Sequence, residues 1–124
     1  MKPLSALVLA AALALPAAAA GAQDAPRQCF VLRNMDGTRA ADARTLYAKV
    51  GRDIWRFDMA GACLSTVSSD GLIVEPVGGR STVCGPLDLN IKGRNGGIAV
   101  PCIVRSLTKL TPEEAAALPK GDRP

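Results

Sequence analysis

The stretch Thr45–Met59, TLYAKVGRDIWRFDM, decides the fold because apolar and polar residues largely alternate along both of its halves. Alternation with a period of two is typical of a β-strand that buries one face. Between the halves, Gly51 and Arg52 form a two-residue connection with glycine first, which is typical of a tight β-hairpin. The stretch therefore predicts two antiparallel strands joined by a turn.

The register of this hairpin follows if Val50 is paired with Asp53. One face then becomes apolar and the other largely polar, as a half-buried hairpin requires. The apolar pairs are Ala48 with Trp55 and Leu46 with Phe57, and the pairs on the polar face are Tyr47 with Arg56 and Thr45 with Asp58. A shift by one residue would mix the two faces. We therefore expect Trp55 and Phe57 to be core residues, with a ligand platform at Trp55 as the alternative.

Apolar runs outside the hairpin predict further strands, which lie at 29–32, 72–75, 81–84, 87–91 and 102–107. Thr111 and Glu114 form a capping-box pattern around Pro112, which predicts a short C-terminal helix at about residues 111–118. Segments 36–43 and 92–97 are rich in turn residues and are expected to be connections. The fold class is therefore all-β: a small antiparallel barrel or sandwich of about six strands with a short C-terminal helix.

Residues 1–22, MKPLSALVLAAALALPAAAAGA, have the layout of a secretory signal peptide, with one basic residue, an apolar run and then small residues. The apolar run is about 12 residues long, whereas roughly 20 are needed to cross a bilayer, so we expect no membrane span after cleavage. Cys29 lies too far along the chain to be a lipoprotein cysteine. We therefore expect residues 23–124 to form a single small β domain that is monomeric and periplasmic or secreted.

Charge and composition exclude several classes of function. The formal net charge is +4, and the basic residues are scattered rather than gathered in a run, so we expect no nucleic-acid binding. The chain contains no histidine, which excludes Ser-His and Cys-His nucleophile pairs. We expect no catalytic residue, no metal site and no cofactor.

Four cysteines, an even number in a chain expected to be exported, predict a fold stapled by two disulfides. They are too widely spaced for the close ligand pairs of a zinc site or for a redox Cys-x-x-Cys motif. Three connectivities are possible. We favour Cys29 with Cys102, because the first and last strands of a small β domain are often neighbours. Cys63 would then pair with Cys84.

The order of several short motifs resembles domain-of-unknown-function family 6491, a family of uncharacterised bacterial envelope proteins. The motifs are Cys29-Phe30, the strand Trp55–Met59 leading to Gly61-Ala62-Cys63-Leu64, then Val83-Cys84-Gly85 and Cys102-Ile103-Val104. The resemblance covers about residues 29–110 and implies a small exported β domain, without an assigned activity. Where the family has Gly-Asp after the third cysteine, this chain has Gly85-Pro86, with an acid only at Asp88. No role of that acid is therefore carried over.

Three functions are compatible with these observations. We expect a non-catalytic binding or structural module of the bacterial envelope, whose partner is an envelope protein or a glycan. The first alternative is a secreted enzyme that uses carboxylate or thiol chemistry. The second is a polyanion-binding module, for which Lys92, Arg94 and Arg105 are the candidate anion-binding residues.

Overall fold

The computed structural model describes residues 27–62 and 71–124, in which antiparallel β-strands dominate. The strands are β1 (Phe30–Val31), β2 (Met35–Ala40), β3 (Thr45–Val50), β4 (Asp53–Met59), β5 (Ile73–Pro76), β6 (Thr82–Val83), β7 (Leu89–Asn95), β8 (Ile98–Cys102) and β9 (Val104–Lys109). Helix α1 is Pro112–Ala116, and single 3-10 turns are η1 (Leu32–Asn34), η2 (Val77–Gly79), η3 (Pro86–Asp88) and η4 (Lys120–Asp122).

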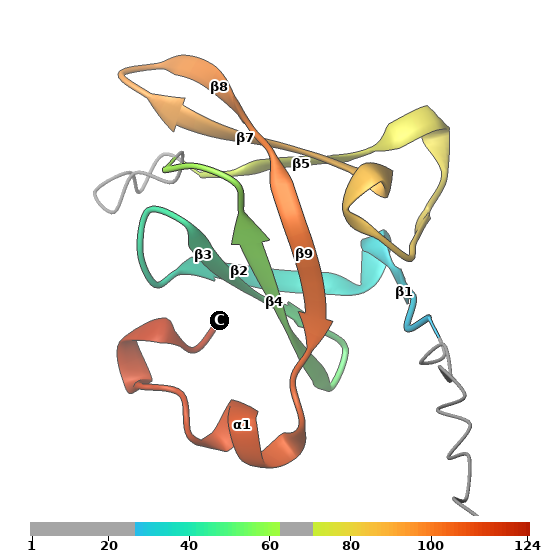
Figure 1. Ribbon diagram of the computed structural model, residues 1–124, viewed down its shortest axis with the longest axis vertical. Helices are drawn as coiled ribbons and strands as arrows, with labels where there is room; N and C mark the ends of the chain where they lie inside the picture. Colours follow the sequence, from blue (N-terminus) through green and yellow to red (C-terminus); the bar gives the residue numbers. More distant parts are fainter. Residues whose placement is uncertain (1–26, 63–70) are drawn as a thin grey trace, which may run out of the picture.

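The described strands form three antiparallel sheets (Figure 1). A four-stranded sheet has the order β2-β3-β4-β9, a three-stranded sheet has the order β5-β7-β8, and β1 pairs with β6. The predicted all-β antiparallel class is confirmed. The described strands do not close into a barrel, and they number nine rather than about six.

The register predicted for the β3–β4 hairpin is confirmed at every pair. Val50 is opposite Asp53, Ala48 is opposite Trp55, and the remaining pairs follow in step. Gly51 adopts a φ of 60° in the turn, a conformation that costs a residue with a Cβ about 1–2 kcal/mol. Glycine at this position therefore lets the two strands pair without strain.

The apolar face of the hairpin forms the centre of the core. Phe57, Leu46 and Ala48 have no exposed surface, and Trp55 is almost completely buried. Phe30 packs against these residues, with ring centroids 4.8 Å from Trp55 and 6.1 Å from Phe57. The other sheets complete the same cluster with Val83, Leu89, Ile91, Cys102 and Val104. One core thus joins all three sheets.

Several segments differ from the sequence-based expectation. The strand expected at 87–91 begins only at Leu89, because residues 86–88 form η3, and the strand expected at 102–107 is divided between the end of β8 and β9. Residues 36–43 were expected to be a connection, but most of β2 lies there, at the edge of the four-stranded sheet. An edge strand with one solvated face needs few apolar residues, so its pattern resembles that of a loop. Residues 92–97 were also expected to be a connection, but β7 continues to Asn95. Only Gly96 and Gly97, both with positive φ, make the turn.

On the polar face of the hairpin, Thr45 and Tyr47 are buried, which shows that part of this face is covered. After α1 the chain turns back toward the four-stranded sheet (Figure 1). A Cβ at Gly37 in β2 would lie 3.8 Å from the carbonyl carbon of Pro124, so the chain end lies against β2. The side chain of Arg123 donates hydrogen bonds to the carbonyl oxygens of Ala116 and Leu118 at the end of α1. These bonds stabilise the segment that turns back toward the sheet.

The start of α1 is confirmed as predicted. The hydroxyl of Thr111 accepts a hydrogen bond from the Glu114 backbone N–H at 3.2 Å, and the Glu114 carboxylate accepts one from the Thr111 N–H at 2.8 Å. Pro112 occupies the first helical position. The helix ends at Ala116, two residues earlier than predicted.

The disulfide pairing favoured from the sequence is wrong, because Cys29 is bonded to Cys84. Their Cα atoms lie 4.2 Å apart, at the end of the β1–β6 ladder in which Phe30 is opposite Val83. The first strand therefore neighbours β6, whereas the expectation placed it beside the last strand. Cys102 is also disulfide-bonded, and Cys63 lies outside the described residues.

We predict that peptide mapping of the unreduced protein recovers a Cys29–Cys84 linked peptide. Because this bond leaves only one further pairing within the chain, mapping should also recover Cys63 linked to Cys102. Replacing Cys29 and Cys84 by alanine should lower the free energy of unfolding by about 4 kcal/mol for a loop of this separation, measured by urea denaturation. A Cys29–Cys102 linked peptide would contradict the β1–β6 pairing.

We also predict that Gly51→Ala destabilises the protein by about 1–2 kcal/mol, because alanine is strained at positive φ. Gly85→Ala is the matched control. Gly85 has an extended φ of −162°, and a Cβ there would meet no atom within 4 Å. Thermal or urea denaturation should show little change in the control, and equal losses in both variants would contradict the turn geometry.

Candidate functional site

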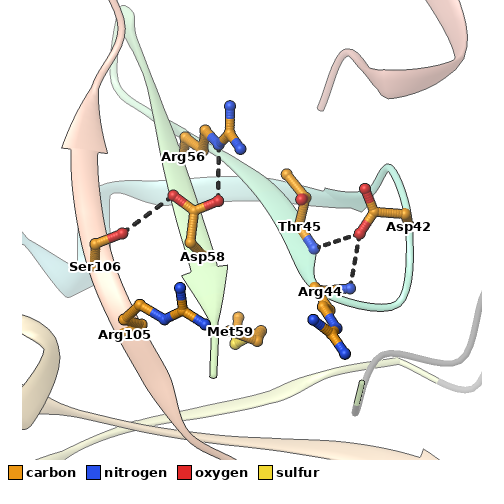
Figure 2. A pocket seen from close by; sticks show the side chains of 8 residues that line it. All are labelled: Asp42, Arg44, Thr45, Arg56, Asp58, Met59, Arg105 and Ser106. Carbon is orange, nitrogen blue, oxygen red and sulfur yellow. Dashed lines mark hydrogen bonds and ion pairs between the residues drawn. The ribbon is translucent and has the colours of Figure 1, made fainter. Parts of the chain in front are cut away.

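The polar face of the four-stranded sheet carries an open pocket of about 560 Å³ where β3 begins and β4 ends. Its lining residues are Asp42, Arg44, Thr45, Arg56, Asp58, Met59, Arg105 and Ser106, shown in Figure 2. They come from β3, β4, β9 and the segment before β3. Three arginines and two aspartates dominate this set, and we call it the arginine pocket.

A β-bulge in β9 places Arg105 in this pocket. Asp58 in β4 is opposite Ser106, but the next residue, Met59, is opposite Val104, so Arg105 is an extra residue in the ladder. In a regular strand with Ser106 on the polar face, Arg105 would point into the core. The bulge instead lets Val104 be buried with Met59 while Arg105 lines the pocket beside Ser106.

The carboxylate of Asp58 is held by two side chains. Nε of Arg56 donates a hydrogen bond to Oδ1 at 2.9 Å, and Oγ of Ser106 donates one to Oδ2 at 3.1 Å (Figure 2). The hydrogen bond to Asp58 raises the pKa of Arg56 above its usual range. Asp58 therefore fixes the direction of Arg56 and has its own charge compensated.

Asp42 organises the other wall of the pocket. Its Oδ1 accepts hydrogen bonds from the backbone N–H groups of Arg44 at 2.7 Å and Thr45 at 2.8 Å. The bond from Arg44 is the main reason why the pKa of Asp42 is lowered. The carbonyl oxygen of Arg44 in turn accepts a bond from the Met59 N–H at 2.8 Å. The backbone of Arg44 is thus fixed on both sides.

Two arginine side chains in the pocket have no carboxylate partner within the described part of the chain. Arg44 and Arg105 make no side-chain hydrogen bond or ion pair with any residue in the described ranges. Arg44 directly precedes β3 and Arg105 is in β9, the strands on the two sides of β4, and in Figure 2 the two side chains lie on either side of Met59. With three guanidiniums against two carboxylates, the pocket has an excess of positive charge that can bind an anion.

The structure separates the three anion-binding residues that the sequence suggested. Lys92 and Arg94 lie on β7 in the three-stranded sheet, and Nζ of Lys92 is already 3.1 Å from Oε2 of Glu75. Arg105 lies on β9 in the other large sheet and lines the arginine pocket. Strand assignment alone could not separate them, because the positions of the sheets depend on long-range pairing.

Arg44 and Arg56 were not among the binding residues expected from the sequence. The hairpin register did place Arg56 beside Asp58 on the polar face, so half of the signal was present. The other half is the β4–β9 pairing, which brings Ser106 to Asp58 across 48 residues of chain. The alternation of apolar and polar residues does not reveal a β-bulge, so the sequence could not predict that Arg105 lines the pocket.

Two further findings concern the described residues. Within 27–62 and 71–124, no group of three or more His, Cys, Asp or Glu side chains could hold a metal ion. No helix in the same part of the chain has the length and apolar character needed to span a membrane. The predicted signal peptide, residues 1–22, lies outside these ranges.

Comparison with known proteins finds no matching family model, no matching curated protein and no matching solved structure. The resemblance to domain-of-unknown-function family 6491 therefore stays a prediction. The arginine pocket is therefore the feature of the described residues that bears on function.

We predict a pH-dependent contribution of Asp42 to stability. Because its pKa is lower in the folded protein than in the unfolded chain, the ionised carboxylate stabilises the fold above about pH 4. This contribution is lost as the pH falls through the lowered pKa. Wild-type protein should therefore unfold at a higher urea concentration than Asp42→Asn at pH 7, and the two should converge in acid. A difference that is independent of pH would contradict this account.

Proposed function

We propose that the protein is a non-catalytic binding module of the bacterial envelope whose arginine pocket recognises an oxyanion on an envelope glycan or protein. The observation that carries this proposal is the pair of arginines, Arg44 and Arg105, that line one pocket and have no carboxylate partner among the described residues. Both are anchored through their backbones, Arg44 by the Asp42 turn and Arg105 by the bulge. Pre-positioned backbones reduce the ordering that binding requires.

Guanidinium groups suit this task because of their shape. Each presents a planar fork of N–H donors that matches the oxygens of a carboxylate, phosphate or sulfate group, and each stays charged at physiological pH. Arg56 adds to the pair, since Nε is used on Asp58 while its Nη groups make no hydrogen bond with a described residue. The pocket thus offers donors from three directions to one anionic group.

The bonding of the carboxylates favours binding over catalysis. Both oxygens of the Asp58 carboxylate already accept a hydrogen bond, from Arg56 and from Ser106, and the chain has no histidine that could act as the general base for the Ser106 hydroxyl. Asp42 is engaged with backbone N–H groups. Among the described residues, every cysteine is in a disulfide, which leaves no thiol there for the alternative of thiol chemistry.

We predict that a short sulfated oligosaccharide binds the oxidised protein and that Arg44→Gln and Arg105→Gln each weaken binding roughly tenfold, because each removes charge-assisted hydrogen bonds. Isothermal titration calorimetry at low salt measures the effect. Inorganic phosphate serves as a second probe of the same pocket. Binding of both probes should weaken as salt is added, because the pocket is open to solvent.

Lys92→Gln and Arg94→Gln are the matched controls, since they remove charge from β7 and leave the pocket intact. Both variants should bind the oligosaccharide as the wild type does. If the β7 variants lose binding and the pocket variants retain it, the anion site lies on the three-stranded sheet and the proposed pocket is wrong. Equal binding by all five proteins would leave no specific site.

A further inference from the structure

A second surface, away from the arginine pocket, exposes several large apolar side chains. It is a groove of about 240 Å³ between η3 and the junction of β8 with β9. The apolar groove, as we call it, is bordered by Val77, Pro86, Leu87, Pro101 and Ile103. Leu87 is 89% exposed and Ile103 is 74% exposed. Clustered exposure of this kind on a soluble protein marks an interaction surface.

The two most exposed side chains are held outward by fixed backbone. Leu87 is in the middle of η3, whose ends are tied by the Asp88 N–H to the Gly85 carbonyl and by the Asp88 carboxylate to two backbone N–H groups. The disulfide at Cys84 anchors this turn. Ile103 is the one residue between β8 and β9, and its carbonyl oxygen accepts a bond from the Ala60 N–H at 2.8 Å.

Cations flank the apolar groove. In the β7–β8 ladder, Lys92 is opposite Pro101 and Arg94 is opposite Ala99, so these two cations share the outward sheet face with Pro101. Arg27 lines a neighbouring hollow that shares Pro86 and Leu87 with the apolar groove. The surface therefore combines protruding aliphatic groups with basic groups nearby.

The two described carboxylates beside the groove, Glu75 and Asp88, are already engaged. Glu75 is paired with Lys92 at 3.1 Å, and Asp88 accepts bonds from the backbone of Cys84 and Gly85. By contrast, Arg27 and Arg94 make no ion pair with any residue of the described ranges. The charge that remains beside the groove is positive and complements an anionic surface.

We propose that the apolar groove rests on an anionic lipid bilayer, with Leu87 and Ile103 entering the headgroup region and Arg27 and Arg94 contacting lipid phosphates. Protruding aliphatic side chains beside basic ones are the pattern by which proteins lie on a membrane without crossing it. Strong protrusion favours a soft surface over a rigid partner with a matching cavity. A second copy joined through a two-fold axis at this groove would bring the same cations together, which is unfavourable.

Sedimentation of the oxidised protein with vesicles tests this proposal. One vesicle preparation contains phosphatidylglycerol and phosphatidylcholine, and the other contains phosphatidylcholine alone. We expect the wild type to bind the anionic vesicles, and Leu87→Ser with Ile103→Ser to lower that binding at least tenfold. Ile98→Ser is the matched control, because Ile98 is 70% exposed but lies outside the groove. It should bind as the wild type does.

Arg94→Gln should weaken binding to anionic vesicles and make it less sensitive to salt. Unfolding curves of each variant show whether the fold is kept. Three results would overturn the proposal: equal binding to both vesicle types, binding that survives the double substitution in a folded protein, or a dimer in sedimentation velocity that the same substitutions disperse. Titration with the sulfated oligosaccharide keeps this test separate, since the groove variants retain the arginine pocket.

Discussion

The pairing of β3 with β4 is the constraint on which the rest of the structure depends. Its register directs Trp55 and Phe57 toward Phe30 and at the same time directs Arg56 and Asp58 to the opposite face. A slip of one residue would exchange these roles, placing charge in the core and aromatic rings in solvent. The free edge of β4 then receives β9, so the core and the arginine pocket arise from the same alignment.

The sequence predicts the local parts of this fold well and the long-range parts poorly. The hairpin register and the cap at Thr111 depend on neighbours within a few residues, and both are confirmed. The partner of Cys29 depends on the pairing of β1 with β6, which no local pattern specifies. The same holds for the candidate site. The hairpin register predicts the face on which Arg56 lies, but the position of Arg105 in the pocket depends on the bulge in β9, which the sequence does not reveal.

The two candidate surfaces divide between the two larger sheets. The arginine pocket is built on β3, β4 and β9, whereas the apolar groove lies beside β7, β8 and η3. The chain passes from one sheet to the other at Ile103, so one nearly continuous strand contributes to both surfaces (Figure 1). The two surfaces lie close together because a chain of this size forms few strands, so one strand contributes residues to both surfaces.

The use of arginine in place of histidine makes the pocket indifferent to mild acid. Guanidinium groups keep their proton throughout the physiological range, and the chain has no imidazole that could gain one near neutrality. Mild acidification therefore gives the arginines no means of releasing the anion that we propose they bind, and release would depend on competing ions, on dilution or on protonation of the ligand itself.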